Sequence, residues 1–297
     1  MPEWQSTLLT RHGLGENYLA TARKWFIPVA RAIAKHQSGA GRPILIGVNG
    51  SQGSGKTTLT DFLCCCLEAD FGLTSARLSL DDVYLTRADR AELGTRIHPL
   101  LATRGVPGTH DMTLLLDTLK ALLDPAHAVG SRLPAFDKSI DDRSPLSDWV
   151  EVATAPSVIL LEGWCMGATP QSPALLAEPI NNLEREEDAQ GVWRSYVNDC
   201  LTQQFPPVYA LVDQWLMLQA PSFDCVFRWR QEQEKKLALS RGGMTDEMMD
   251  DAELVRFVAH FERLTRHCLS TLPDRVDHLL VMDERRAIIA AHIEAPA

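Results

Sequence analysis

Short apolar runs alternate with amphipathic stretches along most of this chain. Continuous apolar runs rich in leucine and β-branched residues predict buried strands. These runs lie at residues 44–49, 77–80, 157–161, 210–218 and 278–282. Apolar residues that recur at steps of three and four predict helices at residues 18–36, 56–70, 113–123, 182–204 and 226–240. Because strands alternate with helices, we expect an α/β fold built on a doubly wound, mostly parallel sheet.

A few segments lie outside this alternation. Proline and charged residues interrupt residues 132–148, which we expect to form a loop. We also expect a helix capped by Thr245 and a last helix over residues 286–293. No internal repeat or long linker divides the sequence. Residues 1–297 are therefore expected to form a single domain, with an N-terminal helical segment over residues 1–42.

Composition and charge argue against several classes of function. Lys+Arg 29 against Asp+Glu 39 gives a net charge of −10, which disfavours binding to a nucleic-acid backbone. A few local cations could still hold a small anionic substrate on such a protein. No run of 18 apolar residues is present, so we expect no membrane span. The first residues lack the layout of a signal peptide and the 7 cysteines form no CxxC pair, so we expect a reduced, cytoplasmic protein.

The strongest chemical signal follows the first predicted strand. Residues 50–57 read Gly-Ser-Gln-Gly-Ser-Gly-Lys-Thr, which matches G-x-x-x-x-G-K-[ST] between a strand and a helix. Its backbone N–H groups can face a phosphate, while Lys56 would reach the β- and γ-phosphates and the Thr57 hydroxyl would bind Mg²⁺. The motif predicts a bound nucleoside triphosphate. We expect it to contact Gly50, Ser51, Gln52, Gly53, Ser54, Gly55, Lys56, Thr57 and Thr58.

Other residues narrow the class of nucleotide-binding protein. The sequence contains no Asn/Thr-Lys-x-Asp motif for guanine, which argues against a GTPase. Residues 239–243 resemble an ABC-transporter signature, but they lie too far after the acidic strand at 157–161. A small-molecule kinase needs a carboxylate after its second strand to deprotonate the acceptor hydroxyl, and Asp81 stands there. The alternative for Asp81 is a solvated acidic turn.

Further charged residues suit phosphoryl transfer. Glu162 ends a buried strand and could hold Mg²⁺ from the side opposite Thr57. Arg228 and Arg230 lie in a helix that would cover the site, where cations could neutralise the transferred phosphoryl group. The alternatives are an ordinary acid at a strand end and two solvated bases on a helix.

Two polar loops are candidates for binding the acceptor. Residues 104–111 and residues 134–143 combine proline with basic and acidic side chains. Arg104, Lys138 and Arg143 could hold a carboxylate or a phosphate on the acceptor. Alternatively, the first loop is a capped turn and the second a charged surface loop.

These motifs occur in an order that resembles a known family. After the phosphate loop come Ser-Leu-Asp-Asp-Val-Tyr-Leu-Thr at 79–86, Arg-Gly-Val-Pro-Gly-Thr-His-Asp at 104–111, Phe-Asp-Lys-Ser at 136–139, Leu-Glu-Gly-Trp at 161–164, Trp-Arg-Gln-Glu-Gln-Glu at 229–234 and Gly-Met-Thr-Asp-Glu at 243–247. The series resembles the plant-type D-glycerate 3-kinase family with its yeast and bacterial relatives. That family belongs to the wider phosphoribulokinase, uridine kinase and pantothenate kinase superfamily. Val83 stands where the family usually has an aromatic residue.

The resemblance implies an ATP-dependent kinase that converts D-glycerate to 3-phosphoglycerate, on a P-loop kinase fold with a helical lid over residues 226–262. It matches Asp81 to the base, Glu162 to the Mg²⁺ site, and Arg228 and Arg230 to the lid. We expect a small anionic acceptor to contact Asp82, Tyr84, Arg104, His110, Asp111, Lys138 and Arg143. A pantothenate-like or nucleoside-like acceptor and a partner-regulated ATPase are the alternatives. We predict no obligatory protein partner.

Overall fold

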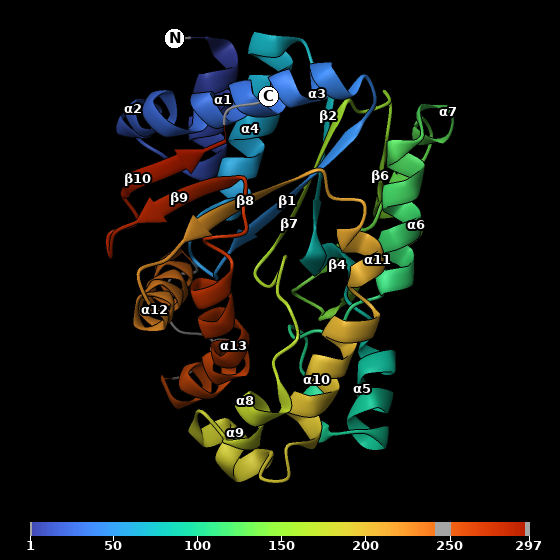
Figure 1. The fold of residues 1–297 in the computed structure, drawn as a ribbon, viewed down its shortest axis with the longest axis vertical. Helices are drawn as coiled ribbons and strands as arrows, with labels where there is room; N and C mark the ends of the chain where they lie inside the picture. Colours follow the sequence, from blue (N-terminus) through green and yellow to red (C-terminus); the bar gives the residue numbers. More distant parts are fainter. Residues whose placement is uncertain (1, 241–250, 295–297) are drawn as a thin grey trace.

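A central sheet organises the computed structural model, which describes residues 2–240 and 251–294 (Figure 1). Its strand order is β10-β9-β8-β1-β7-β2. The strands are β1 Ile44–Gly50, β2 Ser75–Ser79, β7 Val158–Gly163, β8 Gln214–Gln219, β9 His278–Met282 and β10 Ile288–Ile293. Every pairing in this sheet is parallel except that of β10 with β9. The predicted mostly parallel sheet is confirmed.

Both faces of the sheet are covered by helices, because alternate residues of the central strand enter different cores. In β1, Ile44, Ile46 and Val48 pack into one apolar cluster, whereas Leu45 packs into the other. The first cluster includes the N-terminal helices and α4 Lys56–Phe71. The second includes side chains of α6 Met112–Leu123, α10 Val192–Gln203 and α13 Asp251–Thr271. The fold is therefore doubly wound, as predicted.

The other helices and four short strands complete the fold. The N-terminal helices are α1 Glu3–His12, α2 Asn17–Thr21, a π-helical turn Ala22–Phe26 and α3 Ile27–Ala40. Other helices are α5 Arg87–Arg96, α7 Pro125–Ala128, α8 Pro173–Ala177, α9 Asn182–Glu187, α11 Pro206–Tyr209 and α12 Phe223–Ser240. Short strands β3 Arg132–Leu133, β4 Phe136–Asp137, β5 Asp142–Arg143 and β6 Val150–Glu151 form two small two-stranded sheets.

Several local predictions need correction. The helix predicted over 286–293 is wrong, because Asp283 accepts backbone N–H groups in a tight turn that leads into β10, antiparallel to β9. The helix predicted over 182–204 is broken at Gly191, which adopts a φ of 73°. The loop predicted over 132–148 contains short paired strands. Thr245 and its predicted helix cap lie outside the described residues.

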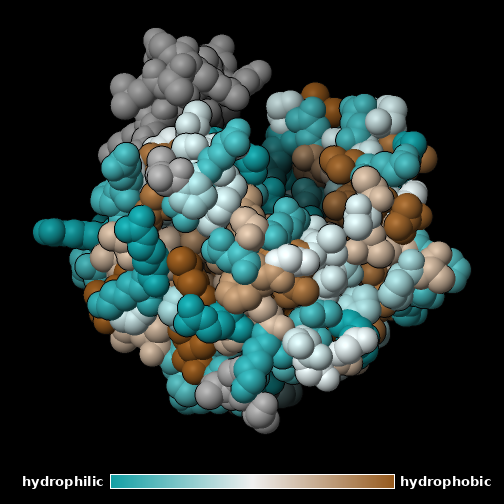
Figure 2. Space-filling model, turned by 90° about the horizontal axis from the view of Figure 1, so that it is seen from above, coloured by the Kyte–Doolittle hydropathy of each residue, from teal (hydrophilic) through white to brown (hydrophobic). Residues whose placement is uncertain are grey.

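Within residues 2–240 and 251–294, no helix is both long and apolar enough to span a bilayer. Seen from above the N-terminal helices, hydrophilic side chains alternate with small hydrophobic patches (Figure 2). Isolated exposed apolar residues of this kind are normal on a globular surface.

A buried ion pair fixes α13 to α9. Arg263 donates to both carboxylate oxygens of Glu184 at 2.7 and 2.6 Å, and to two backbone carbonyls. Because Glu184 is fully buried, Arg263→Ala would leave its charge unpaired and should lower the free energy of unfolding by about 3–5 kcal/mol. Arg256→Ala removes an exposed pair between the same helices, with Glu187, and should cost under about 1 kcal/mol. Urea denaturation tests both variants, and equal losses would contradict this assignment.

Candidate active site

The phosphate loop leaves the sheet at its centre. It follows β1 and enters α4 at Lys56, so its backbone is held between a buried strand and a helix N-terminus. Gly53 has a φ of 77°, and a Cβ there would lie 2.8 Å from the Cβ of Trp229 on α12. The hydroxyls of Ser51 and Ser54 are buried and find no hydrogen-bond partner among the described residues. Such hydroxyls fit an oxyanion such as phosphate.

A carboxylate from the neighbouring strand faces this loop. Glu162 lies near the end of β7, beside Val48 of β1, and is 3% exposed. Thr57 donates its hydroxyl to Oε1 of Glu162 at 2.7 Å, and Nζ of Lys56 lies 3.7 Å from Oε2. Oε2 itself is buried without a hydrogen-bond partner in the described part of the chain. A hydroxyl and a carboxylate with spare acceptor capacity are hard oxygen ligands, which suit Mg²⁺.

The two carboxylates after β2 lie in different environments. Asp82 accepts the backbone N–H of Ser79 at 3.0 Å and so closes a capping box around the turn Leu80–Val83. Asp81 instead accepts the Tyr84 hydroxyl at 2.9 Å and the Lys138 ammonium at 2.6 Å. Asp81 is therefore the carboxylate of this pair that contacts a candidate acceptor loop, through Lys138.

The surroundings of Asp81 and Asp82 shift the pKa values of the two carboxyl groups in opposite directions. Burial alone would raise the pKa of Asp81, but the charges of Lys138 and Lys56 outweigh it and hold that pKa at about 2. Burial raises the pKa of Asp82 to about 6, with a contribution from the Asp81 charge, although the Ser79 N–H opposes the change. Asp81 is thus ionised at neutral pH.

Ion pairs join the two candidate acceptor loops. Arg143 donates to the Asp111 carboxylate at 3.0 Å and to the Tyr84 carbonyl at 3.1 Å. Arg104 forms an ion pair with Asp141 of the second loop. The structure thus brings Asp81, Tyr84, Asp111, Lys138 and Arg143 together.

His110 is the most unusual member of this region. Its ring stacks on Tyr84 with centroids 4.6 Å apart, and it is 3% exposed. Burial lowers its pKa to about 4, so the ring is neutral at physiological pH. Neither ring nitrogen finds a hydrogen-bond partner within the described residues.

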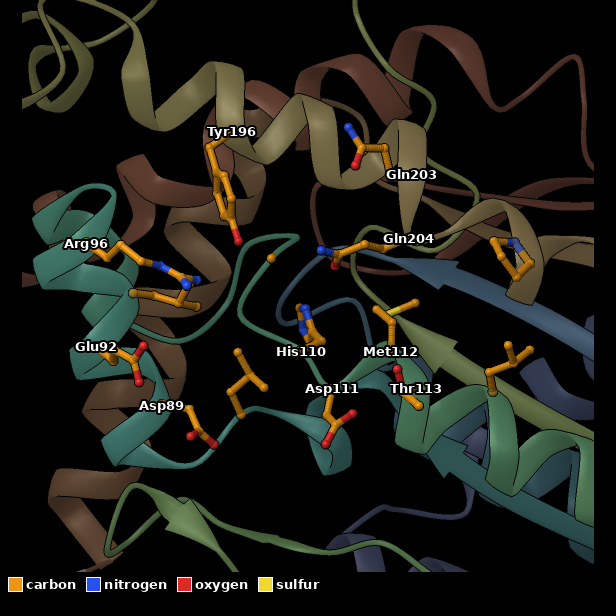
Figure 3. A pocket seen from close by; sticks show the side chains of 15 residues that line it. Asp89, Glu92, Arg96, His110, Asp111, Met112, Thr113, Tyr196, Gln203 and Gln204 are labelled. Atoms are coloured by element: carbon orange, nitrogen blue, oxygen red, sulfur yellow. The ribbon is translucent and has the colours of Figure 1, made fainter.

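His110 also lines a cavity of about 600 Å³ (Figure 3). Tyr196 of α10 and Gln204, which directly follows this helix, point into the cavity opposite Arg96 of α5 (Figure 3). Sequence reasoning missed these three residues, because they belong to helices far apart in the chain and form no motif. Asp81, Lys138 and the phosphate loop do not line this cavity, and the stacked Tyr84–His110 pair lies between it and Asp81.

The two arginines that were expected in a lid take different positions on α12. Arg228 is largely exposed and donates to Glu284 at 3.1 Å, whereas the Arg230 guanidinium lies 5.5 Å from the ring centroid of Phe257. Arg286, which the sequence placed in a helix, donates to the Gly53 carbonyl at 3.0 Å. Its guanidinium lies 5.1 Å from the ring centroid of Trp229. An arginine of the β9–β10 turn therefore contacts the phosphate loop.

Removal of the cation beside Asp81 should change its titration. Lys138→Met is expected to raise the pKa of Asp81 from about 2 toward its ordinary range, because the ammonium stabilises the ionised carboxylate. The acid limb of kcat/KM should then move to higher pH. Lys138→Arg retains the charge and should retain the low value. NMR titration of the Asp81 carboxyl checks both variants, and an unchanged pKa in Lys138→Met would refute the assignment.

Comparisons with known proteins agree with this geometry. A scan against protein-family models finds no match. The chain is 32% identical over 285 residues to an uncharacterized kinase of Schizosaccharomyces pombe, covering 89% of this chain and 96% of that protein. It is also 32% identical over 272 residues to the chloroplastic D-glycerate 3-kinase of Arabidopsis thaliana, covering 84% of this chain. This chain belongs to the D-glycerate 3-kinase family of P-loop kinases.

A solved structure resembles the kinase over nearly its whole length. The kinase superimposes on D-glycerate 3-kinase from Cryptococcus neoformans with a TM-score of 0.72 and 27% identity, covering 94% of this chain and 99% of that chain. The kinase spans 54% of the length of the plant enzyme, so it corresponds to about half of that protein. The P-loop kinase fold predicted from the sequence is confirmed.

Proposed function

We propose that this kinase transfers the γ-phosphate of ATP to a hydroxyl of D-glycerate and releases 3-phosphoglycerate and ADP. The observation that carries the proposal is the contact of Asp81 with Lys138, at 2.6 Å, between the phosphate loop and the acceptor loops. Glycerate carries a carboxylate close to its hydroxyls. One cation can therefore hold the carboxylate while the adjacent aspartate accepts a hydroxyl proton. The plant and fungal relatives named for D-glycerate support this acceptor.

Residues of this chain are assigned to each step of the phosphoryl transfer. Residues 50–58 hold the phosphates, and Lys56 stabilises the phosphoryl group in transfer. Thr57 and Glu162 would hold Mg²⁺ together with the phosphates, and Mg²⁺ supplies charge neutralisation on the β- and γ-oxygens when bound. Asp81 takes the proton as the acceptor oxygen forms its bond to phosphorus and the bond to ADP breaks, with the electron pair leaving on ADP.

The described residues suit a magnesium ion that is shared with the nucleotide. Residues 2–240 and 251–294 contain no cluster of three or more His, Cys, Asp or Glu side chains arranged for a metal. Magnesium usually binds through one or two carboxylates together with substrate phosphates and water, which is what Glu162 and Thr57 offer.

Three further points belong to the proposal. We place residues 1–297 in one kinase domain whose lid spans residues 226–262, of which residues 241–250 lie outside the described part. The acceptor is small and anionic, and neither nucleic acid nor an obligatory protein partner is required. The 7 cysteines are free, which supports a reducing compartment such as the cytoplasm.

The test is ATP consumption with a panel of acceptors that includes D-glycerate, pantothenate and uridine, with the product identified by mass. ADP release that depends on D-glycerate and yields a phosphoglycerate is the expected result. ADP release that depends on another alcohol would assign that alcohol, in place of D-glycerate, as the ligand of residues 104–111 and 134–143. ATP turnover indifferent to every alcohol would favour a partner-regulated ATPase instead.

A further inference from the structure

Arg90 of α5 is a buried arginine that belongs to none of the motifs found in the sequence. Its side chain is 1% exposed and donates to three backbone carbonyls: Nε to Leu85 at 3.2 Å, Nη1 to Ala102 at 2.9 Å and Nη2 to Asp141 at 2.7 Å. Nη2 also lies 3.0 Å from Oδ2 of Asp141. Every nitrogen of the guanidinium therefore has a partner, and one side chain ties together three segments of the chain.

Asp141 is the acid that neutralises this buried charge, and it also pairs with Arg104 of the candidate acceptor loop 104–111. Its backbone φ of 55° lies in the left-handed region, which residues other than glycine seldom adopt. Such a conformation persists only where the surrounding contacts enforce it, and it is concentrated at functional sites. Two ion pairs and one backbone hydrogen bond therefore clamp Asp141 in a conformation that the chain alone disfavours.

Asp141 ends the turn that carries Lys138. β4 pairs with β5 in an antiparallel hairpin, and residues 138–141 connect the two strands, with Lys138 at one end and Asp141 at the other. The Lys138 side chain is 57% exposed, yet its ammonium lies 2.6 Å from Oδ2 of Asp81. Because more than half of this side chain is exposed, packing does little to fix it. The position of the ammonium therefore depends on how firmly the turn is held.

Phe136 anchors the other end of the hairpin to the same arginines. The guanidinium groups of Arg90 and Arg104 lie 5.9 and 5.6 Å from the centroid of its ring. The ring also makes an edge contact with Tyr84, at 5.3 Å between centroids, and Tyr84 donates its hydroxyl to Asp81. The contacts that hold the hairpin are thus joined to the side chains around the reactive carboxylate.

We propose that Arg90 and Asp141 are positioning residues, which hold the Lys138 ammonium beside Asp81 through the turn 138–141. Arg90 touches no reacting atom and acts through Asp141. The clamp keeps the ammonium within reach of both Asp81 and the acceptor carboxylate, so that its orientation is fixed before the acceptor binds. This inference rests on the proposed function, since it concerns the cation that receives the acceptor in the same phosphoryl transfer.

Asp141→Gly removes both ion pairs and leaves the turn able to form, because glycine adopts a φ of 55° without strain. The backbone carbonyl of residue 141 can still accept from Arg90. Without the clamp, Lys138 should be held less closely at Asp81 and at the acceptor. We expect the KM for D-glycerate to rise about tenfold or more, with the KM for ATP changed by less than about twofold. Asp141→Asn keeps an oxygen acceptor in the same place and should show a smaller rise.

The titration of Asp81 gives a second readout, which needs no acceptor. Asp141→Gly should raise the pKa of Asp81 above about 2, because the Lys138 ammonium that lowers it is held less closely. Lys56 and Tyr84, which also lower this pKa, are unchanged in the variant. Loss of a nearby negative charge without movement of Lys138 would instead lower the pKa. The sign of the change, measured by NMR, therefore separates positioning from a direct electrostatic effect.

A double-mutant cycle shows whether the effect passes through Lys138. In a Lys138→Met background, Asp141→Gly should raise neither the KM for D-glycerate nor the pKa of Asp81, because the positioned cation is absent. Equal rises in both backgrounds would overturn the proposal, as would an Asp141→Gly variant with both values unchanged. Arg263→Ala weakens the fold away from the hairpin and should leave both values unchanged. A matching rise there would assign the effect to lost stability and overturn the positioning role.

Arg90→Met removes the clamp from its other side and should change both values in the same direction as Asp141→Gly. It leaves three carbonyls without their donor, so Asp141→Gly decides the matter if Arg90→Met does not fold. An unmodified chain that shows no ADP release dependent on D-glycerate overturns the proposed function. The titration of Asp81 still decides the positioning role in that case.

Discussion

Asp81→Asn is expected to lower kcat by about 10³-fold while ATP binding is retained, because asparagine keeps the shape of the side chain but cannot accept the hydroxyl proton. The substitution also removes the ion pair with Lys138. Steady-state kinetics with D-glycerate, together with calorimetric titration of ATP, measures the two effects separately.

Asp82→Asn is the matched control. Its remaining side-chain oxygen can still accept the Ser79 N–H that closes the capping box, so the loss of kcat should be at least an order of magnitude smaller. Equal losses in the two variants would show that the turn, and not the Asp81 carboxylate, limits the rate. Unchanged turnover in Asp81→Asn would remove the proposed base.

The low pKa of Asp81 has a consequence for the acceptor. A carboxylate with a pKa of about 2 is a weak base while Lys138 donates to it. A carboxylate on the acceptor competes with Asp81 for that ammonium. When Lys138 turns from Asp81 toward the acceptor carboxylate, we expect the basicity of Asp81 to rise. A neutral alcohol of the same size offers no such competitor. We therefore expect it to be a poor acceptor even when it can reach the site.

The nucleotide half of the site could be predicted because its determinants are local. Residues 50–57 are consecutive, and the buried runs on either side specify a strand, a loop and a helix without reference to the rest of the chain. Glu162 could be singled out as the acid that ends a buried strand, and the parallel pairing of β7 with β1 places it beside the phosphate loop.

The acceptor half was predictable only as a set of candidate residues. The ion-pair and hydrogen-bond partners of loop side chains depend on tertiary contacts, which no local sequence pattern predicts. The sequence offered Lys138 and Arg143 as free cations, yet the structure pairs them with Asp81 and Asp111. Arg286 was assigned to a helix, since nothing in the eight residues 286–293 distinguishes a hairpin from a short helix before the pairing with β9 is known.

Glu162→Gln should lower kcat by about 10²-fold or more and raise the Mg²⁺ concentration needed for half-maximal rate. Glutamine keeps the volume of the buried side chain and can still accept the Thr57 hydroxyl, so the fold should persist. The substitution removes the negative charge that lies 3.7 Å from the Lys56 ammonium. Metal-free ATP should then bind at least as well as before, because the triphosphate no longer faces a carboxylate. Rate measurements across a Mg²⁺ series, with ATP titrated in the presence of a chelator, test both effects. A kcat that falls with no change in Mg²⁺ dependence would assign Glu162 to holding Lys56 in place rather than to the metal.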